Sequence, residues 1–285
     1  MKKFCLMAAI AVGALCSCGS KQTSTTTAKV PAVAEPVVSD STLVLYYSQT
    51  GATKAVAEEI QRQLGCSISS IEALTPYDSD YDATIERWRS EIEKGTKVGI
   101  KPLTVNLDDY NTVFLGFPIW GGTYALPVAT FLADNSLEGK RVVTFATFGS
   151  GGIDPATSDV RTAQPKAEVI RGYGVRNARI SKAPGEVMRF LIEDGYMAGR
   201  IEPLPEYSDA VPVTPKEDSI FNAACGSYKY PLGSPVTVAT RTTDSGTDYR
   251  FEVRSQTPNA GEATSTIYVT VPDGAAPEFT EVIRH

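Results

Sequence analysis

The sequence predicts an α/β fold with a doubly wound, five-stranded parallel sheet, followed by a small antiparallel β domain. Between residues 41 and 200, short apolar runs alternate with amphipathic segments of helical period, which is typical of crossover connections in a parallel sheet. Turns rich in glycine or hydroxyl side chains follow three of these runs. After residue 219 helical period disappears and apolar residues alternate with polar ones, which indicates antiparallel strands.

Five strands and five helices are predicted for the first domain. Continuous apolar runs at 42–47, 112–116 and 141–148 are typical of strands buried on both faces, and shorter runs at 67–71 and 167–170 complete the sheet. Apolar residues at helical spacing predict helices at 53–64, 81–94, 126–132, 155–162 and 185–197. In the second helix, Trp88 is expected on a face away from the strand ends.

The N-terminus predicts export. Lys2 and Lys3 precede an apolar run at 4–15, which is shorter than the ~20 residues that a membrane-spanning helix needs. The run ends in Leu15-Cys16-Ser17-Cys18, which resembles the bacterial lipoprotein cleavage box. We expect a signal peptide at 1–17, lipidation of Cys18, and a flexible tether at 18–40 that anchors the protein at the cell envelope, on the periplasmic side or the cell surface. An ordinary signal peptide of a soluble protein is the alternative.

Charge and reactive residues exclude several function classes. Removing Lys2 and Lys3 with the signal lowers the formal net charge from −6 to −8, and no basic stripe for nucleic acid remains. Cys66 and Cys225 are far apart in the sequence, without the spacing of a metal or redox pair. Two separate thiols are expected, and a disulfide between them in an oxidising compartment is the alternative. The one histidine is His285, so the usual general base of a hydrolase triad is missing.

The first candidate site lies between the first predicted strand and its helix. Hydroxyl side chains and backbone N–H groups converge there on the positive end of a helix, where a phosphate group fits. The nucleotide-binding patterns GxxxxGK[ST] and GxGxxG are absent. A capped helix start without ligand is the alternative. The candidate phosphate ligands are Ser48, Gln49, Thr50, Gly51, Ala52 and Thr53.

Two further loops follow the third and fourth predicted strands, at the same edge of the sheet. The first is an aromatic loop with paired glycines, which offers a stacking face, and the second exposes main-chain groups that can bind the polar edge of a flat ring. For Trp120 a core position is the alternative. The candidate ring-binding residues are Pro118, Ile119, Trp120, Gly121, Gly122, Tyr124, Phe148, Gly149, Ser150, Gly151 and Gly152.

In their order and spacing these three motifs resemble the flavodoxin family over about residues 41–199, including the stretches 77–81 and 128–132. The resemblance implies strand order 2-1-3-4-5 and non-covalent binding of FMN, with the phosphate at 48–53 and the isoalloxazine ring at 118–122 and 148–152. One position departs from the related sequences, which commonly carry a second tryptophan where this chain has Gly121. Stacking on one face of the ring is then weaker or supplied by Tyr124.

Two function classes remain open. The first is an FMN-dependent redox protein, either an electron carrier or a reductase of a quinone-like acceptor, in which no side chain is needed as acid or base. In the reductase, Trp120, Tyr124 and Phe148 would line a second pocket over the ring. The other class is a flavodoxin-shaped binding module without cofactor.

The C-terminal part is predicted as a Pro-rich linker at 201–219 and a small β domain at 220–285. Strands are predicted at 236–242, 249–254, 267–271 and 279–283, with a possible fifth at 227–230. Asp244-Ser245-Gly246-Thr247 is typical of a hairpin turn. Partner docking and structural capping both remain open as roles for this region.

Overall fold

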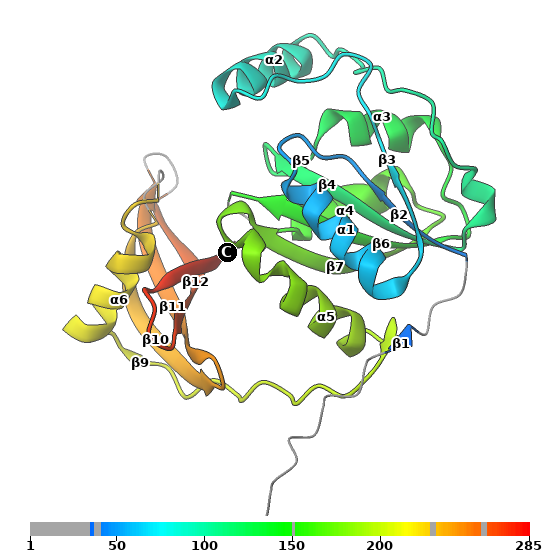
Figure 1. Ribbon diagram of the computed structural model, residues 1–285. Coiled ribbons are helices and arrows are strands. Elements are labelled where there is room, and N and C mark those ends of the chain that lie inside the picture. The colour runs from blue at the N-terminus through cyan, green and yellow to red at the C-terminus, as the bar shows by residue number, and fades with distance from the viewer. Residues whose placement is uncertain (1–34, 37–40, 150–151, 229–231, 258–260) are drawn as a thin grey trace, which may run out of the picture. The chain divides into compact units, whose positions relative to one another are not determined.

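The computed structural model describes residues 35–36, 41–149, 152–228, 232–257 and 261–285 (Figure 1). A parallel sheet with helices on both faces is followed by a separate antiparallel sheet, which confirms the predicted fold class. The predicted signal peptide, Cys18 and most of the predicted tether lie outside the described residues. Within the predicted tether, β1 (Glu35–Pro36) pairs with β8 (Met197–Ala198).

The parallel sheet has the order that the resemblance implied. In chain order β2 is the first strand of this sheet. It lies between β3 and β4, and β6 and then β7 follow beyond β4. Its strands are β3 (Ser67–Ser70), β2 (Thr42–Tyr46), β4 (Thr112–Trp120), β6 (Arg141–Phe148) and β7 (Glu168–Arg176). β7 extends six residues past the predicted end at 170, to Arg176, and pairs with β6 over this length with a register shift between Thr144 and Ala146.

Helices cover the two faces of this sheet. Residues of α1 and α5 share one core with Val44 and Phe114, whereas residues of α3 and α4 share the other core with Leu43 and Leu115. The helices are α1 (Ala52–Leu64), α2 (Tyr81–Glu93), α3 (Leu126–Asp134), α4 (Asp154–Ala163) and α5 (Ala183–Glu193), with 3-10 turns at Leu107–Asp109 and Asn177–Lys182. No helix in the described residues is long and apolar enough to cross a membrane.

Helix α2 differs from the other four because it buries little of itself. Of the side chains of α2, all of which the structure describes, Thr84 alone is buried, and Ile92 is 53% exposed. The helix is held mainly by polar contacts near its start, where Asp80 accepts a hydrogen bond from the Ala83 N–H. Apolar spacing in the sequence predicted the helix correctly but not its loose packing.

The antiparallel sheet has the order β13-β12-β11-β10-β9. The four predicted strands are confirmed and are longer than predicted, and β10 turns into β11 at Asp244-Ser245 as expected. The possible strand at 227–230 falls partly outside the described residues, and Ser227 and Tyr228 are not in a strand. The strands are β9 (Val211–Pro212), β10 (Ser234–Thr243), β11 (Gly246–Thr257), β12 (Gly261–Pro272) and β13 (Glu278–Arg284).

The prediction that the C-terminal region contains no helix is wrong. Part of the predicted linker forms β9, and α6 (Pro215–Cys225) covers one face of the sheet, where Phe221 packs edge to face on Phe251 with ring centroids 5.3 Å apart. Thr214 and Glu217 form a reciprocal capping box at the start of α6, which satisfies two backbone donors at the helix end.

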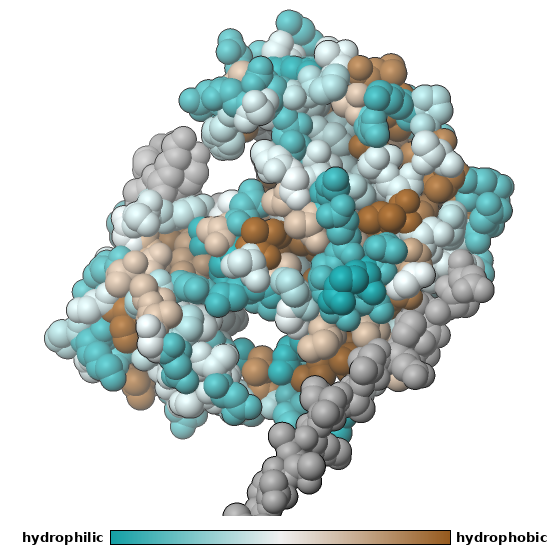
Figure 2. Space-filling model, in the orientation of Figure 1, coloured by the Kyte–Doolittle hydropathy of each residue, from teal (hydrophilic) through white to brown (hydrophobic). Residues whose placement is uncertain are grey.

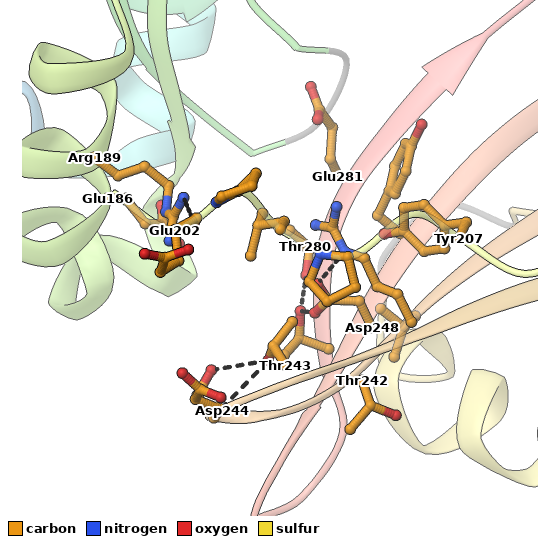
Figure 3. A pocket seen from close by; sticks show the side chains of 18 of the residues that line it. Glu186, Arg189, Glu202, Tyr207, Thr242, Thr243, Asp244, Asp248, Thr280 and Glu281 are labelled. Atoms are coloured by element: carbon orange, nitrogen blue, oxygen red, sulfur yellow. Dashed lines mark hydrogen bonds and ion pairs between the residues drawn. The ribbon is translucent and has the colours of Figure 1, made fainter. Parts of the chain in front are cut away.

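The opposite face of the antiparallel sheet is polar. The Arg241 guanidinium lies 2.8 Å from the Asp248 carboxylate, which also accepts a 2.8 Å hydrogen bond from Thr270. Tyr207 lies on the Arg241 guanidinium, 4.5 Å from the ring centroid. Asp248, Thr280 and Tyr207 line a pocket of about 910 Å³ (Figure 3).

The surface seen in Figure 2 mixes apolar with hydrophilic residues. The large exposed apolar side chains belong to separate segments of the chain, such as Leu74 at 61% and Val211 at 53% exposure. Apolar residues scattered in this way are normal for a globular surface. The functional site is therefore better sought at the carboxyl edge of the parallel sheet.

Candidate functional site

The loop between β2 and α1 is folded around Ser48. The Ser48 hydroxyl oxygen accepts hydrogen bonds from the N–H groups of Gly51, at 3.2 Å, and Lys54, at 3.1 Å. Gly51 has φ 92° at the N-cap of α1, a left-handed conformation that favours glycine. Ser48 and Gly51 thus give the loop its tight turn at the start of the helix.

This turn leaves several backbone donors available. Within the described part of the chain, the N–H groups of Thr50, Ala52 and Thr53 have no hydrogen-bond acceptor. Thr50 and Gly51 are exposed, and the segment 48–53 contains no carboxylate. Unpaired N–H groups at the positive end of a helix form a site for an anion.

Thr53 faces the sheet rather than the loop opening. Its hydroxyl lies 2.8 Å from the hydroxyl of Thr147 on β6, and both side chains are 1% exposed. Thr53 belongs to the apolar face of α1, together with Val56, Ala57 and Ile60. We expected this hydroxyl to donate to a phosphate, but in the structure it joins the first candidate segment to β6, the strand that leads into the third.

Gln49 connects the loop to the segment before α2. Its side-chain oxygen accepts a 2.9 Å hydrogen bond from the Tyr47 hydroxyl, and its amide nitrogen donates to the Asp78 carbonyl at 2.5 Å. Gln49 is half-buried. The Gln49 side chain therefore positions the loop against residues 76–80.

The predicted aromatic loop is a β-hairpin. Strand β4 continues four residues past the predicted end at residue 116, and β5 (Thr123–Tyr124) pairs back on it, with Ile119 opposite Tyr124. Gly121 and Gly122 form the turn, with φ of 59° and 92°. Positive φ at both central residues is typical of a two-residue hairpin turn and favours glycine. Pro118 lies on the other side of the ladder, beside Thr147 of β6.

Trp120 takes the core position that the sequence left open as the alternative. Its ring packs edge to face against Tyr77, with centroids 4.8 Å apart, and against Tyr47, at 5.9 Å. The residue is half-buried and borders the apolar core. Trp120 is therefore directed toward Tyr47 and Tyr77.

The remaining predicted residues frame the hairpin from the side of β6 and α4. Tyr124 packs on Phe117, with centroids 5.9 Å apart, and burial and the nearby Asp159 raise its pKa. Phe148 is 3% exposed and belongs to the core. The Gly149 carbonyl accepts a 2.9 Å hydrogen bond from Arg176.

The last members of the third loop are only partly described. Ser150 and Gly151 lie outside the described residues. Gly152 has φ 70°, a conformation that favours glycine at the start of the segment leading to α4.

Trp88 lies at the candidate site, beside Gly121, where the sequence did not place it. A Cβ placed with ideal geometry on Gly121 would lie 2.4 Å from Cζ2 and 2.6 Å from Cη2 of the Trp88 ring. The expectation that Trp88 points away from the strand ends is therefore wrong. Helical spacing gives the face of a helix on which a residue lies, but not the direction in which a loosely packed helix presents that face.

A second pocket of about 380 Å³ opens toward β3, beside the loop of residues 48–53, which we call the phosphate-type loop. Tyr47 and Tyr77 line it, and burial raises the pKa of both phenols. Its charged side chains include Lys101 and Glu72, which form an ion pair at 2.7 Å. Within the described residues, no group of three His, Cys, Asp or Glu side chains is arranged to hold a metal ion.

Comparison with known proteins gives a family match over the first domain. The profile described as Flavodoxin matches residues 41–188. Among solved structures, a Bacteroides eggerthii flavoprotein is 26% identical, with 55% of this chain and 98% of that chain covered and a TM-score of 0.44. A Bacteroides uniformis flavoprotein is 24% identical, with 53% of this chain and 99% of that chain covered and a TM-score of 0.47. A Lactobacillus acidophilus flavoprotein in complex with FMN is 22% identical, with 53% of this chain and 99% of that chain covered and a TM-score of 0.41. No curated protein matches the sequence.

Proposed function

This chain belongs to the flavodoxin family, and from that membership we propose that its first domain binds FMN non-covalently and uses it for electron transfer. The bound cofactor supplies one- and two-electron chemistry, whereas the protein supplies binding, orientation and electrostatics.

The observation that carries the proposal is the set of unpaired donors at the start of α1. The N–H groups of Thr50, Ala52 and Thr53 have no acceptor in the described residues, and the Thr50 hydroxyl is on an exposed side chain. A phosphate dianion would satisfy these donors at once. Lys54 adds a positive charge one turn into the helix, 3.6 Å from Glu58.

The ring of the cofactor belongs beside the hairpin turn. Gly121 and Gly122 are exposed and carry no side chain, so a flat ring can approach the backbone closely. The peptide between them is also the most adaptable of the hairpin, and its N–H and C=O are suited to contact the polar edge of the ring. Gly149, together with Ser150 and Gly151, is proposed to contact the ring from the third loop.

The redox reaction needs no acid or base from this chain. We propose that the protein exchanges electrons with a redox partner or with a quinone-like small molecule at the cell envelope, and that Cys18 carries the lipid that holds it there. The negative formal charge of the chain opposes the accumulation of further negative charge on a bound cofactor, although salt screens distant charges beyond ~8 Å.

Flavin content tests the proposal. We expect the purified protein to be yellow, and the FMN-depleted protein to bind added FMN much more tightly than riboflavin, because riboflavin lacks the phosphate. Tight binding of neither flavin, by absorbance and equilibrium dialysis, would contradict the proposal and favour a binding module without cofactor. Equal affinity for FMN and riboflavin would contradict the assignment of the phosphate to residues 48–53.

A further inference from the structure

A side chain from another element contacts the turn of the β4–β5 hairpin at Gly121. Gly121 carries no side chain of its own, and the space that a Cβ would enter is taken by the six-membered ring of Trp88, with Cζ2 at 2.4 Å and Cη2 at 2.6 Å. Gly121 and Trp88 are 33 positions apart in the chain. An indole ring from α2 therefore lies on the turn at the carboxyl edge of the sheet.

Helix α2 is held so that it presents this ring. Its apolar side chains contribute little to the core, and Ile92 is 53% exposed. The helix is instead held by polar contacts. Arg87 donates to the carbonyl groups of Pro76 and Thr75, at 2.8 and 3.1 Å, and forms an ion pair with Glu91 at 2.8 Å.

The same segment is tied to the phosphate-type loop. The Gln49 amide donates to the Asp78 carbonyl, and the Thr84 hydroxyl donates to that carbonyl at 2.8 Å. Asp78 thus connects residue 49 of the loop with the first turn of α2. A ligand that orders the loop would by these contacts also fix the helix that carries Trp88.

Trp120, the other tryptophan of the chain, packs against two tyrosines. Its ring meets those of Tyr47 and Tyr77 edge to face, at centroid distances of 5.9 and 4.8 Å. Trp88 is half-buried and packs on a turn whose two residues have no side chains. Of the two indoles, that of Trp88 lies directly at the exposed glycine turn.

We propose that Trp88 supplies the aromatic face on which the flavin ring packs, from helix α2, in place of a side chain at position 121. This inference rests on the proposed binding of FMN and names the residue that holds the ring. Trp88 is then a binding residue outside the three segments identified from the sequence. Planar stacking on an aromatic side chain is a common and strong contact for flat heterocycles.

Titration of the FMN-depleted full-length protein with FMN tests the role of Trp88. We expect Trp88→Ala to raise the Kd by more than about tenfold, the equivalent of ~1.4 kcal/mol, and Trp88→Phe to retain most of the affinity. Ile92→Ala, a change one turn further along the same helix at an exposed position, is the matched control and should leave the Kd unchanged. The emission of bound FMN is a second readout, because an indole in contact quenches flavin emission and Trp88→Phe should restore part of it.

A double-variant cycle separates stacking from a merely structural role. Gly121→Trp alone should weaken FMN binding and lower the Tm of the FMN-free protein, because the new side chain meets Trp88. In Gly121→Trp with Trp88→Ala, the second ring is gone, and both the affinity and the Tm should recover. The strain of a non-glycine residue at φ 59° is common to both backgrounds and cancels in the comparison.

The outcomes distinguish this inference from the proposed function. Tight FMN binding with a Kd that Trp88→Ala leaves unchanged overturns the inference and leaves the proposed function standing. Equal loss of affinity in Trp88→Ala and Ile92→Ala overturns it as well, because both would then act through the stability of α2. Failure of the wild-type protein to bind FMN overturns both.

Discussion

The hydroxyl groups of Thr53 and Thr147 lie 2.8 Å apart beneath the phosphate-type loop, and each side chain is 1% exposed. This bond joins the first turn of α1 to the carboxyl end of β6. It holds the first candidate segment against the strand that leads into the third, although neither hydroxyl faces the solvent.

The first prediction concerns this pair. Thr53→Val should lower the free energy of unfolding by about 1 to 3 kcal/mol, because it leaves the Thr147 hydroxyl buried without its partner. Replacing both residues with valine should cost less than the single change, since no polar group is then left unpaired. Urea unfolding of the two single variants and the double variant measures this, and a double variant with additive losses would contradict it.

The second prediction assigns direct phosphate contact to Thr50. Thr50→Val should weaken FMN binding by more than about tenfold, because a hydrogen bond to a charged group contributes about 1.5 to 3 kcal/mol. The unfolding free energy should hardly change, since Thr50 is exposed. Riboflavin is the control ligand, and its affinity should be the same for the wild type and the variant. An unchanged FMN affinity would rule out the Thr50 hydroxyl as a ligand.

The third prediction concerns Gln164 at the end of α4. Its side chain is 7% exposed; its amide donates to the carbonyls of Leu132 and Asn135, and its oxygen accepts from the Leu137 N–H. Gln164→Ala should therefore destabilise the protein by at least about 2 kcal/mol. Thr162→Ala, an exposed change two positions away, should have little effect in the same thermal or urea melts.

The fourth prediction is a dependence on pH. Burial raises the pKa of Cys66 to about 11 and that of Cys225 to about 12, whereas an unfolded thiol has a pKa of about 8.5. The protons that the folded state retains stabilise it below pH ~8.5, and this contribution is lost as the pH rises toward the folded values. Unfolding free energy should fall above pH ~8.5, and less so in a Cys66→Ala, Cys225→Ala protein.

The thiols should also be slow to react while the protein is folded. Both cysteines are free, and at pH 8 the raised pKa values keep them protonated and inert toward alkylation. Urea should make both reactive. Fast labelling of the native protein at pH 8 would show that the thiols are accessible as thiolates.

The fifth prediction concerns location. Cys18→Ser should convert a membrane-bound protein into a soluble or unprocessed one, because several acyl chains on one cysteine, at ~0.8 kcal/mol per buried CH₂, make the attachment effectively permanent. FMN binding should not change. Fractionation and the mass of the mature N-terminus measure this; wild-type protein in the soluble fraction, without lipid mass and beginning at another residue, would contradict it.

The order of strands and helices was predictable because it depends on local patterns. The runs 42–47 and 141–148 are mostly apolar, which is typical of strands buried on both faces. Even the orientation of Thr53 was readable, since it continues the spacing of Val56, Ala57, Ile60 and Leu64 on α1. Helix α6 also had a signal, the Thr214 and Glu217 capping box, although its apolar period is weak.

The contact of Trp88 with Gly121 could not be read from the sequence. It depends on where a nearly unburied helix is held by Arg87 and by residues 75–80, and tertiary contacts of this kind have no periodic signature. Trp120 shows the same limit. Its proline and glycine neighbours indicated a loop tip. In the structure Trp120 is part of β4 and pairs with Thr123 of β5, and its ring packs on Tyr47 and Tyr77.

The outer strands of the C-terminal sheet bear on self-association. On one side, β9 contributes only two residues, and Pro212 has no N–H to offer a further strand. On the other, β13 carries Glu278, Glu281 and Arg284, and charges along an outer strand oppose the addition of another chain. Copies crowded on one membrane by the proposed anchor would meet at high local concentration. These two edges would then hinder fibre-like aggregation of the β domains.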